Sequence, residues 1–352
     1  MNIGIDGNEA NTKNKVGVSQ YAYHVLSKLH QLDKKNNYFI YLKNPPNPDM
    51  PQANSRWQYI VFGPQKFWTL FALPLKLFSQ KIKLDLFYSP HHYLPLFCPC
   101  PSIVTIHDIG YLQFKDQFTP KDFYQLKNWT QKSISKSNHI IAVSNFTKDE
   151  IIKTYHIKPT KISIAYNGVT PPTKINSPQI SIKKPYFLYV GTLKPNKNIP
   201  HLITSFSKAL TLQRSNAPIF LIIAGKKGWL YDDIFAQVKK LKLQKKVIFT
   251  GFITENDKWY LYKNAIATVI PSLYEGFGIP AIESQSVGTP VVASTIPVFK
   301  EILGNSAILT NNLVQSLSSP IDKKYSKLGL LNSQKFTWTN TAKSILEVFA
   351  KY

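Results

Sequence analysis

Two acidic side chains, Glu275 and Glu283, stand eight residues apart in the stretch EGFGIPAIE. A carboxylate can bind the hydroxyls of a sugar or stabilise positive charge that develops during a reaction, and a second one can accept two hydrogen bonds from a ribose diol. Pro280 is expected to begin a helix, because the N–H that proline lacks has no partner at the first helical position. Glu275 would then lie on a loop, and Glu283 in the first turn of the helix.

The backbone between the two acids has the chemistry of an anion site. At the start of the expected helix, the N–H groups of Gly278 and Ile279 have no partner within the helix, which suits a diphosphate. Gly276 and Gly278 carry no side chain, so the hydroxyls of a ligand can approach the backbone closely. The spacing alone leaves a second interpretation open, in which Glu283 only complements the helix dipole and Glu275 is a solvated loop residue.

The elements that must position these residues are parallel α/β units, because short β-branched and aromatic runs alternate with helical patterns almost throughout. In the first half of the chain we expect strands at 2–6, 38–42, 59–62, 84–89, 103–107, 139–143 and 162–166. Helical patterns cover 17–30, 120–137 and 146–155. The pattern is lost over 170–184, a segment with three prolines that is typical of a linker.

After this segment the alternation begins again. We expect strands at 186–190, 220–224, 247–250, 267–271 and 291–294, and helices at 199–212, 230–241, 257–263, 280–287 and 338–349. The predicted organisation is therefore a first domain over 1–170, a linker over 171–184, a second domain over 185–335, and a terminal helix over 336–352 that could return to the first domain. In sheets of this kind, ligands bind outside the carboxyl ends of the strands.

The size and composition of the chain agree with two globular domains. With 352 residues, of which 43% are hydrophobic, it is too long for one ordinary core. Cys98 and Cys100 are too close in sequence for an easy disulfide, and two thiols alone make a poor metal site. We interpret them as reduced thiols. The sequence starts directly in a strand with no leader, and its most apolar window, 67–75, is too short to span a bilayer. We expect a cytoplasmic protein that could lie at the inner face of the membrane.

The net charge of +24 is the most unusual bulk property and raises the question of nucleic-acid binding. The positive residues are spread over both halves of the chain, and only two of them, Arg56 and Arg214, are arginines. Proteins that read a base sequence favour the bidentate guanidinium of arginine. The sequence therefore argues against specific nucleic-acid binding. It favours a solvated lysine-rich surface, with attraction to an anionic membrane or acceptor as the next interpretation.

Several sequence blocks resemble one known family. The run PSLYEGFGIPAIESQSVGTPVVAS, residues 271–294, resembles the acidic signature of the family 4 glycosyltransferases with the GT-B fold. Further similar blocks, in the same order as in that family, are VTIHD at 104–108, IIAVSNFTKDEI at 140–151, YNGV at 166–169 and YVGTLKPNKNIPHLI at 189–203. The resemblance covers most of the chain. It implies an α/β fold of two facing Rossmann-like domains with a cleft between them, an N-terminal domain for the acceptor and a C-terminal domain for a nucleotide sugar.

The resemblance also assigns roles in the C-terminal domain. It places Glu275 beside the donor sugar, Glu283 on the ribose, and Lys197 on the diphosphate. It implies that backbone groups bind the donor at two places: Gly191 and Thr192, and the run Gly276, Phe277, Gly278 and Ile279. Without the resemblance, Lys197 could equally be one more surface lysine. Many members of the family have arginines where this chain has Thr192 and Asn196, so phosphate neutralisation would fall to Lys197 and the helix terminus.

In the N-terminal domain the resemblance singles out Gly17 and His107. It implies that the backbone at Gly17 approaches the phosphate and the acceptor, and that His107 lies near the donor sugar, where it could bind a hydroxyl or shuttle a proton. From the residues alone, Gly17 could be an ordinary turn glycine and His107 a strand-end histidine capped by Asp108. Ser144 and Asn145 are best explained as a helix N-cap.

The segment 67–78 combines four large apolar residues with nearby lysines. It could form a peripheral membrane face for a lipid-linked acceptor. The interpretation we favour is a helix packed in the N-terminal domain.

The predicted activity is retaining transfer of a hexose from a nucleoside diphosphate sugar to a hydroxyl of a glycan or lipid-linked acceptor. The residue patterns of the blocks GTLKPNKN and HDIGY resemble a subgroup of the family and favour a mannosyltransferase that uses GDP-mannose. UDP-sugars such as UDP-glucose are the alternative donors. The family implies a front-face reaction with no bound metal and no other cofactor. A GT-B sugar-nucleotide epimerase and a basic, non-enzymatic binding protein are the rival functions.

Overall fold

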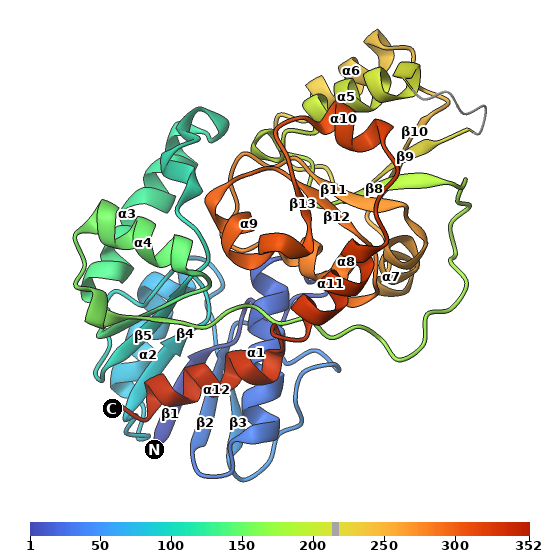
Figure 1. The fold of residues 1–352 in the computed structure, drawn as a ribbon. Helices are drawn as coiled ribbons and strands as arrows, with labels where there is room; N and C mark the ends of the chain where they lie inside the picture. Colours follow the sequence, from blue (N-terminus) through green and yellow to red (C-terminus); the bar gives the residue numbers. More distant parts are fainter. Residues whose placement is uncertain (213–217) are drawn as a thin grey trace. The chain divides into compact units, whose positions relative to one another are not determined.

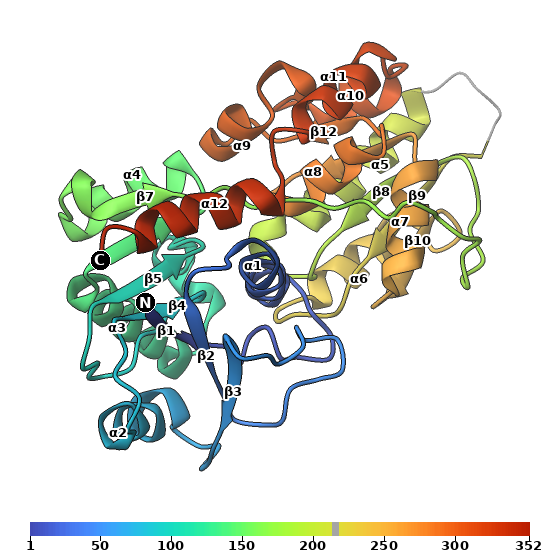
Figure 2. The same cartoon turned by 90° about the horizontal axis from the view of Figure 1, so that it is seen from below.

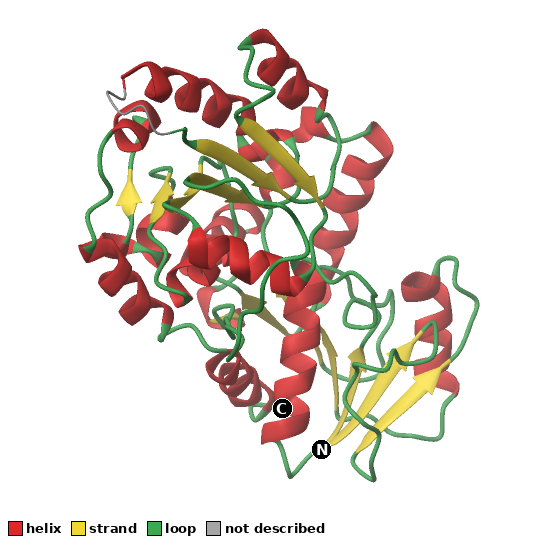
Figure 3. Ribbon diagram, turned by 90° about the vertical axis from the view of Figure 1, so that its right-hand side faces the viewer, coloured by secondary structure: helices red, strands yellow, loops and turns green. Residues whose placement is uncertain are grey.

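The computed structural model describes residues 1–212 and 218–352, so Arg214 lies outside the described residues. It divides into two compact units (Figure 1). Unit 1 consists of residues 1–168 together with 338–352, and unit 2 of residues 169–337. Each unit is built around one parallel sheet with helices packed against it, which confirms the predicted α/β class (Figure 3).

The sheet of unit 1 has seven parallel strands in the order β3-β2-β1-β4-β5-β6-β7. Their bounds are β1 Asn2–Asp6, β2 Asn37–Leu42, β3 Trp57–Val61, β4 Leu86–Ser89, β5 Ser102–Ile106, β6 His139–Ala142 and β7 Ile162–Ile164. All seven were predicted, with ends displaced by a residue or two. The strand predicted over 103–107 ends at Ile106, which leaves His107 in the loop beyond β5.

The helices of unit 1 come from both ends of the chain. They are α1 Val18–Leu32, the short π-helix η1 Trp68–Ala72 that continues into α2 Leu73–Ser79, α3 Pro120–Lys136, α4 Asn145–Tyr155 and α12 Trp338–Phe349. Helix α12 packs across α1 (Figure 2), and Trp338 meets the ring of Tyr21 at a centroid distance of 6.0 Å. At the other end of α12, Phe349 packs against Tyr88 of β4. The terminal helix therefore completes the surface of unit 1.

Local sequence explains where the helices of unit 1 begin. Thr119 caps α3 by accepting a hydrogen bond from the backbone N–H of Asp122 at 3.1 Å, and Pro120 follows it at the first helical position. Ser144 caps α4 in the same way through the N–H of Thr147, as predicted.

The sheet of unit 2 has six parallel strands in the order β10-β9-β8-β11-β12-β13. Their bounds are β8 Tyr186–Val190, β9 Phe220–Ala224, β10 Val247–Gly251, β11 Ala267–Ile270, β12 Val291–Ala293 and β13 Ile308–Leu309. Both faces are buried. Along β8, Phe187 and Tyr189 join the apolar cluster under α5, whereas Tyr186 and Leu188 join the cluster under α7. This explains why the strands appear in the sequence as continuous apolar runs.

Unit 2 contains α5 Ile199–Leu212, α6 Asp232–Lys240, α7 Glu255–Asn264, α8 Ile279–Ser286, α9 Pro297–Ile302, α10 Leu313–Ser318 and α11 Lys324–Ser333. Helix α8 begins at Ile279, one residue before the predicted start, because Pro280 occupies the second helical position. Glu283 therefore lies beyond the first turn, and its predicted place within that turn was wrong.

The segment predicted as a linker, 171–184, contains no helix or strand and runs along α7 of unit 2. The N–H of Gln179 donates to Asp257 at 2.8 Å, and the N–H of Asn176 donates to Asn256 at 3.0 Å. Ile175, Ile180 and Ile182 pack against the apolar cluster under α7. This segment is therefore attached to unit 2.

In each sheet there is one point from which successive strands are added first toward one edge and then toward the other. In unit 1 this switch point lies between β1 and β4, and in unit 2 between β8 and β11. The loops that follow those strands diverge to opposite sides, and the space outside their carboxyl ends is where such sheets bind ligands.

Among the described residues, no helix has both the length and the apolar character that a bilayer span requires. Cys98 and Cys100 are free, with their Sγ atoms 3.6 Å apart.

Candidate functional site

Two loops meet at the switch point of unit 2. The first follows β8 and runs from Gly191 to Asn198, and the second follows β11 and runs from Pro271 to Gly278. The backbone N–H of Leu273 donates to the carbonyl of Asn196 at 2.9 Å and so joins the two loops. Most of the predicted donor-binding residues of unit 2 lie on these loops or at the start of α8.

Lys197 and Glu275 form an ion pair between the two loops. The Ser272 hydroxyl donates to the same carboxylate oxygen of Glu275 at 2.8 Å. The side chains of Lys197 and Glu275 are 16% and 15% exposed, so the pair is largely shielded but can be reached by a ligand. An ammonium has three donors, so Lys197 can hold Glu275 and still donate to a phosphate oxygen.

Tyr189, on the face of β8 that packs under α5, lies next to this ion pair. Burial, and then the negative charge of Glu275, raises the pKa of Tyr189 well above its usual value. Its hydroxyl stays protonated and lies 3.4 Å from the carbonyl of Thr192. This hydrogen bond thus helps to hold the Gly191–Thr192 turn in place.

Two glycines allow the loops after β8 and β9 to pass very close to each other. A Cβ atom on Gly225 would lie 2.0 Å from the carbonyl oxygen of Gly191, which no side chain can accommodate. Main-chain hydrogen bonds join the same two loops on either side of this contact: the N–H of Gly191 donates to the carbonyl of Ala224, and the N–H of Leu193 donates to the carbonyl of Lys226. The Gly191–Thr192 turn is therefore held against β9 by main-chain contacts.

The start of α8 presents backbone donors at the same edge of the sheet. Gly278 precedes the helix with φ 100°, and a Cβ there would lie 2.6 Å from the ring of Phe299. No side chain caps this terminus, and Pro280 has no N–H. The N–H groups of Gly278 and Ile279 are therefore available to an anion. Phe277 is buried against Phe336.

Glu283 is held from the neighbouring helix α7. The Lys258 ammonium donates to Oε1 at 2.7 Å, and the Tyr262 hydroxyl donates to Oε2 at 3.0 Å. Burial acts to lower the pKa of Lys258, but the charges of Glu283 and Glu255 outweigh it and raise this pKa above its usual value. Glu283 is therefore a fixed carboxylate with a charged partner, and the interpretation of Glu283 as no more than a helix-dipole complement does not account for these contacts.

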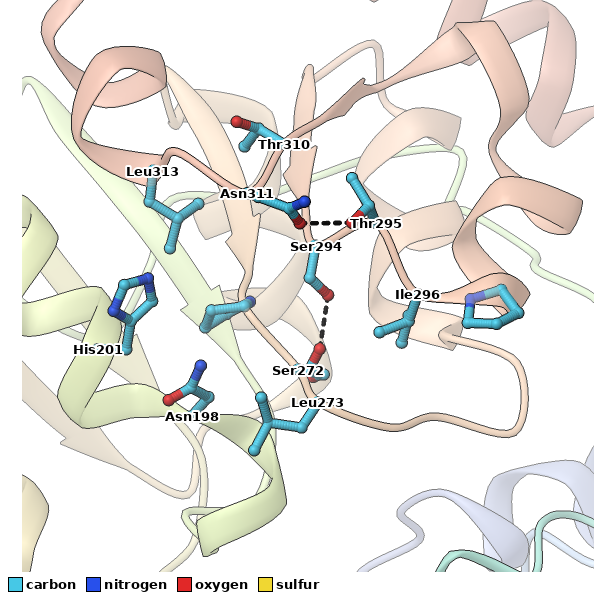
Figure 4. Close-up of a pocket in the computed structure, with 12 residues that line it drawn as sticks. Asn198, His201, Ser272, Leu273, Ser294, Thr295, Ile296, Thr310, Asn311 and Leu313 are labelled. Carbon is cyan, nitrogen blue, oxygen red and sulfur yellow. Dashed lines mark hydrogen bonds between the residues drawn. The ribbon is translucent and has the colours of Figure 1, made fainter.

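A pocket of about 410 Å³ with both polar and apolar lining opens beside Ser272, at the carboxyl ends of β11, β12 and β13 (Figure 4). Its wall includes Asn198 and His201 from the start of α5, and Ser294, Thr295, Thr310 and Asn311 from the loops after β12 and β13. The Ser294 hydroxyl donates to the Ser272 carbonyl at 2.5 Å, and Thr295 donates to Asn311. None of its lining residues is an acid, a lysine or an arginine. Such a lining suits the hydroxyl groups of a sugar better than it suits a phosphate.

Unit 1 holds the two remaining predicted site residues. Gly17 immediately precedes α1 with φ 52°, and a Cβ there would meet nothing within 4 Å. His107 follows β5, and its Nε2 donates to the carbonyl of Pro90 at 2.9 Å. A carbonyl can only accept, so in the neutral ring Nδ1 of His107 is the free acceptor.

His107 is neutral because of its surroundings. Burial, and then the neighbouring His92, lowers the pKa of His107 to about 3. The two rings stack at a centroid distance of 5.6 Å, and Tyr21 meets His107 edge-on at 4.7 Å. His107 can therefore bind a hydroxyl as an acceptor, but its proton-bearing nitrogen is already occupied by Pro90.

A buried ion pair lies at the switch point of unit 1. Nε2 of His91, which follows β4, lies 3.0 Å from Oδ2 of Asp6 at the end of β1. Burial acts to raise the pKa of Asp6, but His91 outweighs it and lowers this pKa. Burial likewise acts to lower the pKa of His91, but Asp6 outweighs it and raises this pKa. The pair fixes the loop that carries Pro90 and His92.

Sequence reasoning missed the residues that hold the predicted ones. Ser272 stands three residues before Glu275, and Lys258 and Tyr262 stand four apart on one face of α7. That spacing was a usable signal for two side chains with a common partner. His92 gave no signal beyond its place after a strand. Its Nε2 lies 3.4 Å from the N–H of His107, and its Nδ1 is buried with no hydrogen-bond partner among the described residues.

A family model described as Glycosyltransferase Family 4 matches residues 16–171, and one described as Glycosyl transferases group 1 matches residues 172–327. The O-antigen chain mannosyltransferase RfbU of Salmonella typhimurium is 33% identical over 257 residues, which cover 73% of this chain and 68% of that protein. The O-antigen chain mannosyltransferase B of Escherichia coli is 27% identical over 285 residues, 75% of this chain and 74% of that protein.

Solved structures show the same fold over the whole chain. Sucrose-phosphate synthase from Thermosynechococcus elongatus has a TM-score of 0.73 at 18% identity and covers 100% of this chain and 98% of its own. HepE from Anabaena, in complex with UDP and glucose, has a TM-score of 0.72 at 17% identity and covers 100% of both chains. At these identities the likeness concerns the fold.

Proposed function

Because this chain belongs to the family 4 and group 1 glycosyltransferases with the GT-B fold, we propose that it transfers mannose from GDP-mannose, with retention at the anomeric carbon. The acceptor in this proposal is a hydroxyl of a glycan or lipid-linked glycan. Mannose is supported by the two curated relatives, which are both named O-antigen chain mannosyltransferases. Membership of this family removes the epimerase and the non-enzymatic binding protein as rival functions.

The observation that carries the proposed mechanism is the Lys197–Glu275 ion pair at the switch point of unit 2. When the bond between the sugar and the phosphate breaks, its electron pair passes to a phosphate oxygen. In unit 2, Lys197 and the first N–H groups of α8 can stabilise that charge. Glu275 lies one hydrogen bond away, where it can bind the sugar as positive charge develops on its ring.

The acceptor is deprotonated by the departing phosphate in this proposal. The acceptor oxygen forms the new bond on the face that the diphosphate leaves, and its proton passes to the phosphate oxygen. A bound metal or other cofactor is not required, because Lys197 supplies the cation that the diphosphate needs. We expect the reaction to take place in the cytoplasm, at the inner face of the membrane if the acceptor is lipid-linked.

The nucleotide half of the donor is proposed to lie against Glu283. Lys258 and Tyr262 hold both oxygens of this carboxylate in place, and each oxygen retains a lone pair for a ribose hydroxyl. The pocket beside Ser272 would take a sugar, since the hydroxyl and amide groups in its lining carry no charge. UDP-glucose is the second candidate donor, because HepE of the same fold was solved with UDP and glucose.

A thermal-shift panel of GDP-mannose, UDP-glucose, GDP and UDP tests the donor, and turnover with the best binder tests the activity. We expect GDP-mannose to raise the melting temperature most, and NMR of the product to show an α-linked mannose. Glu275→Gln should lose turnover, whereas the matched variant Glu347→Gln, on the exposed side of α12, should retain it. If no nucleotide sugar shifts melting and Glu275→Gln turns over like the parent, the assignment is wrong.

A further inference from the structure

Three acidic side chains lie at or just after the ends of β1 and β5 in unit 1, and two of them have clear structural partners. Asp6 forms the buried pair with His91, and Asp108 accepts a hydrogen bond from the backbone N–H of Gly110 at 3.0 Å. The third, Glu9, is half-buried in the loop between β1 and α1. It lies at the edge of the sheet where ligands bind in folds of this kind.

Glu9 has one side-chain partner in the described part of the chain. The Ser19 hydroxyl, in the first turn of α1, donates to its Oε2 at 2.9 Å, and Oε1 accepts no hydrogen bond from the described residues. No lysine or arginine among these residues forms an ion pair with Glu9, although the chain contains 43 of them. Glu275 and Glu283 in unit 2 each have a lysine partner. Glu9 therefore keeps a charge that no cation offsets and an oxygen that can still accept.

The surroundings of Glu9 leave room for a ligand and supply a donor. Gly17, two residues before Ser19, is exposed, and a Cβ atom there would meet nothing within 4 Å. The loop after β4 carries Tyr93, whose ring packs edge-on against Trp129. Burial, and then the negative charge of Glu9, raises the pKa of Tyr93 to about 12, so its hydroxyl keeps its proton. The hydrogen bonds of Tyr93 to the described residues involve only its backbone.

A carboxylate and a protonated hydroxyl near each other fit one class of ligand. A carboxylate accepts strong hydrogen bonds from hydroxyl groups, and a tyrosine hydroxyl can donate to another oxygen of the same sugar. A phosphate would meet the charge of Glu9, and like charges at close range repel each other. This part of unit 1 therefore favours an uncharged glycan over a ligand that presents a phosphate.

We propose that Glu9 and Tyr93 bind the glycan that accepts the sugar, with Oε1 of Glu9 accepting a hydrogen bond from one glycan hydroxyl and the Tyr93 hydroxyl donating to a second glycan oxygen. Ser19 positions the Glu9 carboxylate by holding Oε2. This inference rests on the proposed transfer to a glycan hydroxyl. It restricts the acceptor to a glycan that is uncharged where it contacts these two residues.

The first measurement needs no nucleotide sugar. Saturation-transfer NMR of the full chain with the methyl α-glycosides of mannose, glucose and galactose reports binding of the glycan alone. We expect the parent to bind at least one of them, and Glu9→Gln and Tyr93→Phe each to bind it at least tenfold more weakly. Both changes nearly preserve the shape of the side chain, so the melting temperature should match that of the parent.

Glu150→Gln is the matched control for the loss of a charge. Glu150 is also half-buried in unit 1, and its side chain accepts one hydrogen bond from a neutral group, the amide of Gln113 at 3.1 Å. It lies on α4, away from the loop after β1. This variant should bind the glycoside like the parent.

A second measurement separates this proposal from the proposed function. The thermal shift with GDP-mannose reports the donor site alone, and in transfer assays Glu9→Gln should raise KM for the glycoside at least tenfold with little change in kcat. If no nucleotide sugar binds but Glu9→Gln still loses the glycoside, the proposed function fails and the glycan site stands. The glycan site is overturned if none of the three glycosides binds the parent, if Glu9→Gln binds them equally well, or if inorganic phosphate displaces the bound glycoside.

Discussion

At the scale of single residues, the site of unit 2 consists of charges that neutralise one another before any donor binds. Lys197 holds Glu275, and Lys258 holds Glu283. Each carboxylate thus has a cation partner and a hydroxyl partner, which fixes its rotamer. Preorganised groups of this kind need little rearrangement when charge develops in the transition state.

The coupling between Lys197 and Glu275 can be measured. Lys197→Ala should lower kcat/KM at least tenfold, about 1.4 kcal/mol, because the departing diphosphate loses its cation. Glu275→Gln should lower kcat/KM by more, and the double variant should lose less than the sum of both, since the two side chains act as one unit. The matched variant Lys208→Ala, on the exposed face of α5, should leave kcat/KM unchanged. Strict additivity would show that the ion pair has no part in catalysis.

The buried pair of Asp6 and His91 predicts a pH dependence of stability. Because folding lowers the pKa of Asp6, ionised Asp6 stabilises the folded protein above pH 3.8. This stabilisation is lost as the pH falls through the pKa that Asp6 has in the folded protein. Because folding raises the pKa of His91, protonated His91 stabilises the folded protein fully below pH 6.5. This stabilisation is lost as the pH rises through the pKa that His91 has in the folded protein. Between these limits, Asp6→Asn should lower the free energy of unfolding by about 3 kcal/mol, because it leaves a buried imidazolium without its partner.

The measurement is the melting temperature of the parent and of Asp6→Asn from acid to alkaline pH. The difference between the two should narrow at alkaline pH, where His91 has lost its proton in both proteins. Asp116→Asn, at an exposed position, should follow the parent at every pH. A difference that stays constant from acid to alkaline pH would contradict the ion pair.

At the scale of elements, the close passage of the loops after β8 and β9 is the most demanding feature of unit 2. Gly225→Ala places a methyl group against the carbonyl oxygen of Gly191 and should destabilise unit 2 by about 3 kcal/mol while it displaces the Gly191–Thr192 turn. Donor binding should weaken with it. Gly251→Ala also has a positive φ, 70°, but meets no atom within 4 Å, so it should cost only about 1 kcal/mol of backbone strain. Equal melting temperatures for the two variants would argue against the steric contact.

The elements themselves show what the sequence could and could not predict. Twelve of the thirteen strands in the described part of the chain were expected, because parallel strands buried on both faces give continuous apolar runs. β13 was missed, since two residues form no periodic pattern. The short helices α9, α10 and α11 were missed for a similar reason, because six to ten residues with polar neighbours give a weak signal.

In the candidate site too, the sequence predicts some residues but not the residues that contact them. Glu275, Glu283 and Lys197 were predicted as site residues because motif spacing and family resemblance mark them. The partners of Glu283 come from elsewhere in the chain, since Lys258 lies 25 residues before Glu283 and on a different helix. Only the packing of α7 against α8 brings these two side chains together, and no local pattern encodes it.

At the scale of the whole molecule, unit 1 is built from two separate stretches of chain, and α12 is the second. Trp338→Ala should loosen this helix, because the indole is 3% exposed, stacks on His24 at 4.7 Å and meets Tyr21. We expect a loss of about 3 kcal/mol in unit 1. Hydrogen exchange should rise in α12 and α1 but not in α5 or α8. Tyr352→Ala, at a position 42% exposed, is the control that should change little.

The same arrangement governs the order in which the chain can fold during synthesis. The ribosome produces the seven strands of unit 1 first, then all of unit 2, and only afterwards residues 338–349. The first unit to emerge is therefore the last to be finished. Until α12 arrives, the aromatic surface around Tyr21 and Tyr88 is open on the nascent chain, and unit 2 can reach its native state while the older half still waits for its final helix.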